Sequence, residues 1–97
     1  MINYVPDGGK LLCVFEERLD TVNCMNFEKE LLGKVQEMKS PVVFDLTKVE
    51  YIASSFLRIC FQVVKEAGAG NLSLVNVSPE IKKVFKIAGV DKLMKID

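Results

Sequence analysis

The segment Val42–Leu57 constrains the possible folds of this chain more than any other segment. Its sequence, VVFDLTKVEYIASSFL, begins with a β-branched apolar run, passes through a polar turn and reaches two serines before an apolar-striped segment. Such a run is typical of a buried strand, and the stripe that follows has the spacing of a helix with a broad apolar side. We therefore predict a strand over Val42–Asp45 and a helix from about Ser55 to Ala67, joined by the polar turn.

The two serines at the start of that helix, Ser54 and Ser55, have two interpretations. A serine that only caps the helix N-terminus is the commoner case, and such a cap is worth about 1 kcal/mol relative to alanine. A serine in this place can also carry a phosphate, because unpaired backbone N–H groups and the positive end of the helix dipole favour a negative group there. The rest of the sequence bears on the choice between a cap and a site of regulation.

The length and the charge of the chain restrict its class. A chain of 97 residues, of which 49% are hydrophobic, predicts one domain over residues 1–97 with a substantial core. Thirteen basic and thirteen acidic residues cancel, so we expect no nucleic-acid partner and no attraction to anionic lipid. The N-terminal sequence MINYVPDGGK lacks the order of a signal peptide, and no apolar run reaches about 18 residues, so no membrane insertion is expected.

The residue types argue against catalysis. The chain has no histidine and therefore lacks the commonest general base and the commonest metal ligand. Lys48 or Lys65 could activate a serine only after losing its proton, for which the sequence gives no reason. The three cysteines, Cys13, Cys24 and Cys60, have no metal-binding or redox spacing. We predict a protein that is not an enzyme, binds no metal or other cofactor, and keeps reduced thiols in the cytoplasm.

Turn residues and apolar periodicity predict the other elements of an α/β domain. Turn-forming residues at 6–9 separate two apolar runs and predict an N-terminal hairpin whose second strand lies inside the sheet. Ser78-Pro79 is a strong helix start, and Gly89 is a helix stop. The further elements expected are strands Ile2–Val5, Leu11–Glu17, Leu72–Val75 and Leu93–Ile96, a helix that follows Arg18–Thr21 and ends near Lys39, and a helix between Ser78 and Gly89.

The same periodicity predicts the buried side of each helix. In the first helix the inward side chains are expected to be Val22, Met25, Leu31, Leu32, Val35 and Met38. In the last helix they are expected to be Ile81, Val84, Phe85 and Ala88. In the middle helix about two-thirds of the surface should be inside. Its narrow polar stripe consists of Arg58, Gln62, Lys65 and Glu66.

Several segments occur here in an order that is characteristic of a known family. They are Leu19-Asp20, the strand with Asp45-Leu46, Val49–Ile52 before Ser54-Ser55, Leu72–Glu80 and Ile87–Leu93. In this order the chain resembles the STAS domain over nearly its whole length, and within that family the bacterial anti-sigma factor antagonists. The resemblance implies an α/β fold with a mixed four- to five-stranded sheet and helices packed mainly on one face.

The resemblance also implies a regulatory function. Members of this type bind an anti-sigma factor, often a serine kinase, and so release a sigma factor for transcription. Phosphorylation of a serine at the start of the second helix abolishes this binding, and a serine phosphatase restores it. By position the phosphorylated residue would be Ser54, with Ser55 as second choice. The partner-binding surface would comprise Asp20, Thr21, Ala53, Ser54, Ser55, Phe56 and Arg58.

Asp20 and Phe56 each have a second interpretation. Asp20 matches an acidic residue near the family's serine, but an aspartate before a helix is also a preferred N-cap. The family sequence Asp-Ser-Ser-Gly or Asp-Ser-Ala-Gly is replaced here by Ala53-Ser54-Ser55-Phe56, which removes an acidic group and adds a large ring. Phe56 lies within the apolar arc of its helix and would then be buried. Alternatively, it would be an exposed anchor at the partner interface.

An alternative function keeps the fold and drops the phosphorylation switch. STAS domains also serve as accessory subunits, for instance on the ATPase of a lipid-transporting ABC system. The replacements on both sides of Ser54-Ser55 make this role a second expectation, with an ABC-transporter ATPase or another signalling protein as partner. The chain itself is expected to be a monomer or a weak homodimer.

Overall fold

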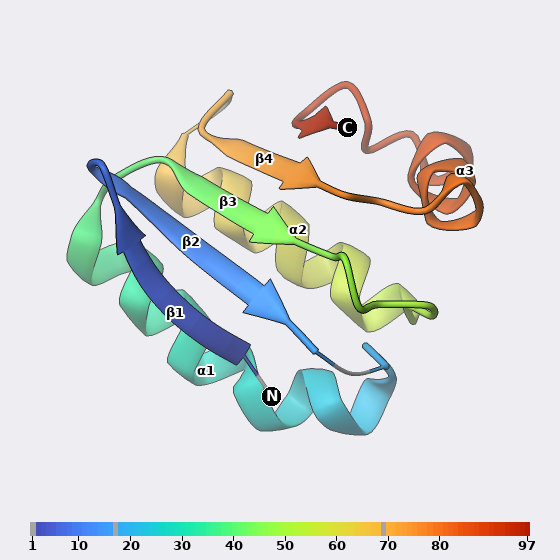
Figure 1. Ribbon diagram of the computed structural model, residues 1–97, viewed down its shortest axis with the longest axis horizontal. Coiled ribbons are helices and arrows are strands. Elements are labelled where there is room, and N and C mark those ends of the chain that lie inside the picture. The colour runs from blue at the N-terminus through green and yellow to red at the C-terminus, as the bar shows by residue number, and fades with distance from the viewer. Residues whose placement is uncertain (1, 17, 69) are drawn as a thin grey trace.

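A five-stranded mixed sheet and three helices make up the structure, a computed structural model that describes residues 2–16, 18–68 and 70–97 (Figure 1). The strands lie across the sheet in the order of the sequence. Only the pair β1–β2 is antiparallel, and the other neighbouring pairs are parallel. The predicted mixed sheet and order of elements are confirmed. The elements are β1 (Ile2–Asp7), β2 (Lys10–Phe15), α1 (Thr21–Met38), β3 (Val42–Asp45), α2 (Ser54–Ala67), β4 (Leu72–Val75), α3 (Pro79–Ala88) and β5 (Lys95–Ile96).

The N-terminal hairpin is tighter than predicted. β1 and β2 are joined by Gly8 and Gly9, whose φ angles are +55° and +84°. Positive φ at both central residues suits a two-residue hairpin turn. β1 therefore extends beyond Val5 into the region predicted as turn, and Pro6 is tolerated there because β1 is an edge strand. The predicted end of the second strand, Glu17, lies outside the described residues.

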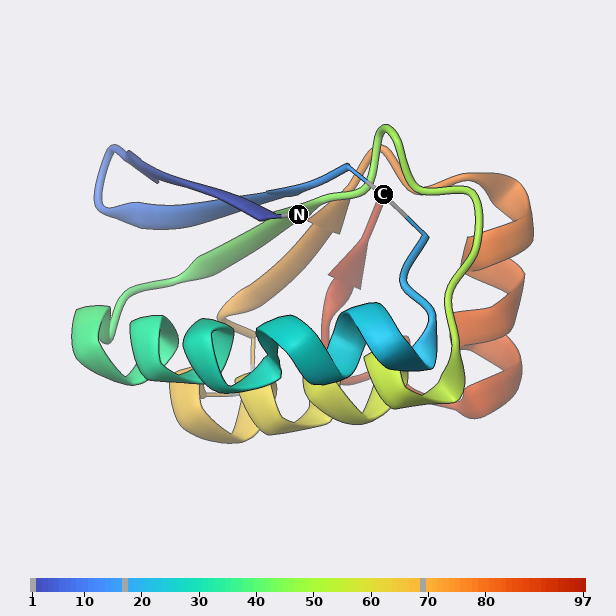
Figure 2. The same ribbon diagram turned by 90° about the horizontal axis from the view of Figure 1, so that it is seen from below.

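The helices cover mainly one face of the sheet, as predicted. Figure 2 shows α1 and α2 side by side along that face and α3 at one end. Successive side chains of a strand alternate between the two faces. The strand residues buried against the helices are Leu11, Cys13, Phe15, Val42, Phe44, Leu72 and Leu74. No helix in the described part of the chain has the length and apolarity that a membrane crossing requires.

Four phenylalanines form the centre of the core, and all four are fully buried. The ring of Phe15 lies 5.0 Å from that of Phe44 and 5.4 Å from that of Phe56, measured between centroids. The ring of Phe56 lies 6.4 Å from that of Phe85 on α3. Edge-on contacts at such distances add to the free energy gained by burial. Phe56 therefore connects the first turn of α2 to β2, β3 and α3.

The predicted buried side of α1 is partly wrong. Cys24, Leu31 and Val35 are its fully buried residues, whereas the side chains of Val22 and Met25 are 66% and 69% exposed. At about 100° per residue, Val22 and Met25 lie roughly 160° and 100° around the helix from Cys24. Met38, at the end of the helix, is also exposed. The apolar residues of α1 thus cover more of its circumference than the core can accept.

Three predicted inward positions on α3 and α2 are also exposed. On α3 only Ile81 and Phe85 are fully buried, and Val84 and Ala88 are exposed. α3 lies at the end of the sheet, where one row of side chains suffices to contact the core (Figure 2). On α2 the ring of Phe61 is 47% exposed, although the predicted polar stripe did not include it.

Candidate functional site

The N-terminal ends of α1 and α2 are held together by a short parallel bridge between Leu19 and Ile52. The backbone N–H of Leu19 donates to the carbonyl of Tyr51 at 2.9 Å, and that of Ala53 donates to the carbonyl of Leu19 at 2.8 Å. Leu19 and Ile52 are themselves buried, which anchors the bridge in the core. The residues that follow Leu19 and those that follow Ile52 are far apart in the sequence. The bridge therefore brings them together at one end of the molecule.

Helix α2 begins one residue earlier than predicted, at Ser54. Its N-cap is Ala53, in an extended conformation with φ −97° and ψ 165°, and no side chain caps the helix. The interpretation of Ser54 or Ser55 as the N-cap is therefore wrong. Ser54 is the first residue of the helix and is exposed, so its hydroxyl group is accessible at the end of α2 that favours negative charge.

Ser55 lies in a different environment. Its Oγ is buried and has no hydrogen-bond partner among the described residues. The neighbouring side chain on α1 is Cys24. Burial raises the pKa of its thiol, and the Ser55 hydroxyl opposes this rise only in part. A kinase could not reach this oxygen without separating α1 from α2. The burial of this oxygen favours Ser54 over Ser55 as the phosphorylated residue, which stays a prediction.

Phe56 is fully buried, so the alternative that it is an exposed partner anchor is wrong. Its ring occupies the centre of the aromatic core described above, and the predicted burial within the apolar arc of α2 is confirmed. In this conformation Phe56 cannot belong to the partner-binding surface. It fixes the direction of the first turn of α2 from inside.

The remaining predicted residues stay at or near the surface. Asp20 is the N-cap of α1, and its Oδ1 accepts a hydrogen bond from the backbone N–H of Asn23 at 2.9 Å. The capping interpretation of Asp20 is confirmed, and its side chain remains half-buried at the same end of the molecule as Ser54. Thr21 and Arg58 are exposed.

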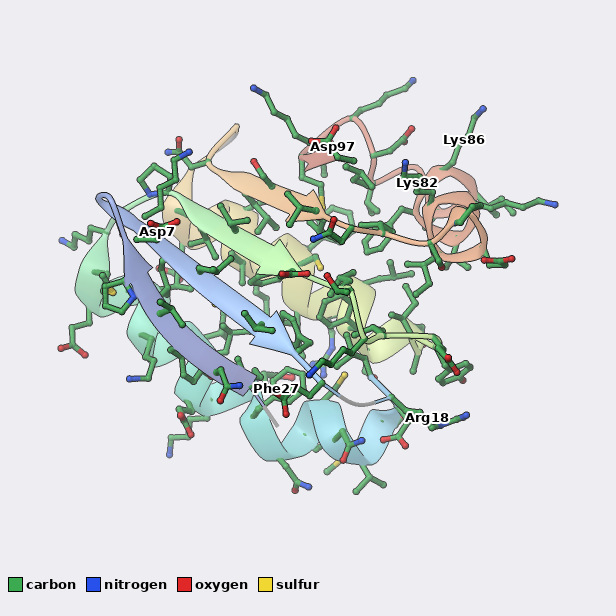
Figure 3. The ribbon with its side chains drawn as sticks, viewed as in Figure 1. Asp7, Arg18, Phe27, Lys82, Lys86 and Asp97 are labelled. Carbon is green, nitrogen blue, oxygen red and sulfur yellow. The ribbon has the colours of Figure 1, made fainter. Side chains whose placement is uncertain are left out.

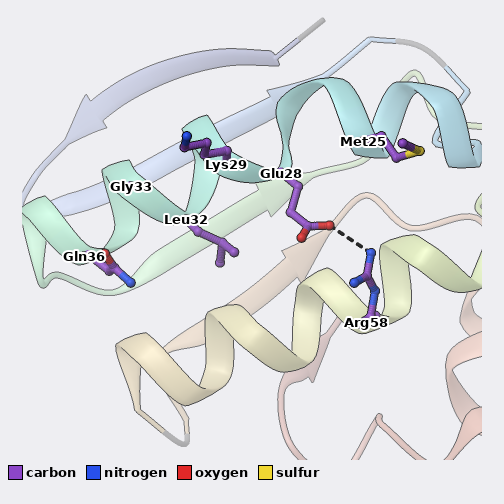
Figure 4. A pocket seen from close by; sticks show the side chains of 7 residues that line it. All are labelled: Met25, Glu28, Lys29, Leu32, Gly33, Gln36 and Arg58. Carbon is purple, nitrogen blue, oxygen red and sulfur yellow. Dashed lines mark hydrogen bonds and ion pairs between the residues drawn. The ribbon is translucent and has the colours of Figure 1, made fainter.

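Arg58 forms an ion pair that connects the two helices. Its Nη2 donates to Oε1 of Glu28 on α1 at 2.9 Å (Figure 4). The pair borders a groove between α1 and α2, seen from close by in Figure 4. The residues that line the groove are Met25, Glu28, Lys29, Leu32, Gly33, Gln36 and Arg58.

Four residues at this end of the molecule were not predicted from the sequence to belong to the site. Val22 and Met25 are strongly exposed, but their helical spacing made them look like core residues. Tyr51 is 43% exposed. Arg18, labelled in Figure 3, lies in the loop that leads into α1, and its guanidinium carbon is 4.4 Å from the centroid of the Tyr51 ring. An aromatic residue in the polar turn before Ser54 was the available signal, because exposed aromatic residues are enriched at interfaces.

The exposed side chains at this end of the molecule are of several chemical kinds. An exposed hydroxyl lies among exposed apolar side chains and a few charges, and no histidine exists in the chain to activate it. Among the described residues, no group of three or more cysteine, aspartate or glutamate side chains could hold a metal ion.

The turn after β3, which leads toward this end, is ordered by Asp45. Partial burial alone would raise the pKa of the Asp45 carboxyl, but hydrogen bonds from Thr47 and Asn76 outweigh it and lower that pKa. The donors are the backbone N–H and the hydroxyl of Thr47 and, at 3.2 Å, the side-chain amide of Asn76. The network stabilises the path from β3 toward Ser54.

Comparison of the chain with known proteins gives a family and a relative of similar sequence. The family model of the STAS domain matches residues 3–97. A Bordetella bronchiseptica protein with the name "Putative anti-sigma factor antagonist BtrV" is 31% identical over 83 residues, which cover 84% of this chain and 72% of that protein.

Several solved structures have the same fold at lower sequence identity. An anti-sigma factor antagonist from Mycobacterium paratuberculosis has a TM-score of 0.83 at 22% identity, covering 99% of this chain and 83% of that chain. The Bacillus cell fate determinant SpoIIAA in the phosphorylated form has a TM-score of 0.73 at 14% identity, covering 100% of this chain and 91% of that chain. A chain of the Acinetobacter MlaFEDB complex has a TM-score of 0.73 at 17% identity, covering 95% of this chain and 97% of that chain.

Proposed function

The chain belongs to the STAS domain family, and we propose that it acts within this family as an anti-sigma factor antagonist switched off by phosphorylation of Ser54. The proposed partner is an anti-sigma factor of the serine kinase type, so that binding releases a sigma factor and acts on transcription. A serine phosphatase would restore the active form. Members of the family are in general binding proteins, and we propose no enzymatic activity for this chain. The STAS domain would span residues 1–97 and work in the cytoplasm, where its three free cysteines would stay reduced.

The accessible hydroxyl of Ser54 is the observation that carries this proposal. It lies at the first residue of α2, it does not cap the helix, and it is exposed. Val22 and Met25 in the first turns of α1 and Tyr51 in the loop before Ser54 are exposed, as expected for a surface that a protein covers. The name of the Bordetella relative supports the same class of function.

The modification needs only a group transfer by the partner kinase. The Ser54 Oγ would bond to the γ-phosphorus of ATP while the bond from that phosphorus to the ADP oxygen breaks, and the serine proton would pass to a base of the kinase. In the phosphatase, water would attack the phosphorus of the phosphorylated Ser54 while the bond from that phosphorus to the serine oxygen breaks. Inorganic phosphate would then leave, and the serine oxygen would regain a proton.

The added phosphate would act on the partner surface more than on the fold. It brings about −1.5 to −2 charges at pH 7, which the N-terminus of α2 tolerates. A partner surface that covers Met25 and Tyr51 would have to remove water from this dianion without neutralising it. Changing a complex from nearly full to nearly empty takes about 5.5 kcal/mol of differential affinity, and a desolvated phosphate can supply this.

Binding of an anti-sigma factor of the serine kinase type from the same organism tests the proposal directly. We expect the unmodified protein and Ser54→Ala to bind it, and the phosphorylated protein and Ser54→Asp to lose binding by at least tenfold. Met38→Glu, which places a carboxylate at the last residue of α1, far from the N-terminal ends of the helices, serves as a control for added charge. Equal binding of all forms would contradict the switch, and binding of a transporter ATPase with no effect of Ser54→Asp would favour the accessory role instead.

A further inference from the structure

The ion pair between Arg58 and Glu28 joins the proposed modification site to the groove between α1 and α2 (Figure 4). The Arg58 side chain is 58% exposed and that of Glu28 is 25% exposed. Ion pairs with this much access to water contribute little to stability, so their partners can be exchanged at small cost. Each of the two residues also lines the groove.

Arg58 lies four residues after Ser54 on the same helix. Side chains four residues apart on a helix lie on the same face, with Cβ atoms roughly 5–6 Å apart. A guanidinium on its long stem can therefore reach either Glu28 across the interface or a group on Ser54 one turn back along α2.

A phosphate on Ser54 would be the stronger of these two partners. It carries up to two negative charges where a carboxylate carries one, and a guanidinium binds its oxygens in a bidentate manner. The backbone N–H groups at the start of α2 would hold the phosphate within the first turn of the helix, near Arg58.

We propose that, when Ser54 is phosphorylated, Arg58 leaves its ion pair with Glu28 and binds the phosphate instead. This proposal rests on the proposed function above. The groove then loses the guanidinium of Arg58, and the carboxylate of Glu28 is left unpaired beside Met25. A single modification thus changes the charge of two adjacent parts of the partner-binding surface, the start of α2 and the groove. Arg58 is a positioning residue in this exchange.

A titration of the phosphate tests the exchange without any partner protein. Phosphoserine is installed at position 54 during translation, and its second pKa is followed by phosphorus NMR in the wild type, Arg58→Gln and Arg58→Lys. We expect Arg58→Gln to raise the phosphate pKa by about 0.5 pH unit and Arg58→Lys to raise it less. Lys65→Gln removes the same charge from the last turn of α2 and should leave the phosphate pKa unchanged.

A second signal reports Arg58 itself. Its side-chain nitrogen resonance should move on phosphorylation in the wild type and not in Ser54→Ala treated in the same way. The proposal is overturned if the phosphate pKa is equal in the wild type and Arg58→Gln, if Lys65→Gln raises it as much, or if the Arg58 resonance stays in place. Loss of partner binding on phosphorylation, measured separately, would then still support the proposed function, whereas an exchange without loss of binding would contradict that function alone.

Discussion

Ser54 and Ser55 are consecutive residues in the first turn of α2, yet one hydroxyl is exposed and the oxygen of the other is buried against α1. The difference arises because successive residues of a helix point about 100° apart. Phe56, the next residue, points fully into the core and fixes this orientation. The surface thus offers a kinase one serine of the pair.

We expect phosphorylation to map to Ser54 alone. Ser54→Ala should abolish the mass increase of about 80 Da that phosphate adds, whereas Ser55→Ala should retain it. Because the Ser55 oxygen has no partner in the described residues, Ser55→Ala should change the free energy of unfolding by less than about 1 kcal/mol. Peptide mass spectrometry and urea unfolding measure the two effects, and phosphate on Ser55 in the Ser54→Ala protein would contradict the assignment.

Replacement of Phe56 should destabilise the fold rather than weaken the partner interface directly. Phe56→Ala removes a fully buried ring that contacts three other phenylalanines, and we expect a loss of about 3–5 kcal/mol. Phe61→Ala, on the same helix but 47% exposed, should cost less than about 1.5 kcal/mol. Urea unfolding of the two variants gives the comparison, and equal losses would contradict the central role of Phe56.

The short buried strands and the start of α3 were predictable because local chemistry determines them. β3 and β4 are apolar runs bounded by turn residues, and both match their predicted bounds. Ser78 caps α3, with its Oγ accepting from the N–H of Ile81 at 3.3 Å, and Gly89 ends the helix with φ +76°. In these segments propensity, pattern and tertiary structure agree.

The start of α2 and the exposed side of α1 were not predictable from local preference. A serine is a better N-cap than alanine, but the backbone bond from Ala53 to Leu19 fixes the end of the loop and makes Ala53 the cap. On α1, apolar residues occur on more than one side, and periodicity alone does not say which stripe the sheet and α2 cover. Val22 and Met25 were therefore assigned to the core, although they belong to the candidate site.

Met25 should contribute to partner binding without supporting the fold. Its side chain is 69% exposed, so Met25→Glu should leave the free energy of unfolding within about 0.5 kcal/mol of the wild type. Affinity for the anti-sigma factor should fall by at least tenfold, because the change puts a charge into an apolar contact. Met38→Glu makes the same exchange at the other end of α1, about 20 Å along the helix axis, and should bind like the wild type. Calorimetric titration measures both, and a larger effect of Met38→Glu would move the interface away from Ser54.

High pH should destabilise the protein through its buried thiols. Burial raises the pKa of Cys13 from 9.0 to about 12, although Lys34 acts in the opposite direction. The unfolded chain therefore loses this proton near pH 9, while the folded chain keeps it until about pH 12. The contribution of the thiol to stability is complete below pH 9 and is lost as the pH rises toward 12.

The slope of unfolding free energy against pH measures this effect. Between pH 9.5 and 11, one such thiol should lower the free energy of unfolding by up to about 1.4 kcal/mol per pH unit. Cys13→Ala should reduce the slope in this range, whatever its effect on absolute stability. Leu11→Val, at a buried position of the same strand with no titrating group, should lower stability without altering the slope. A slope in Cys13→Ala equal to that of the wild type would show that the Cys13 thiol does not drive the alkaline loss.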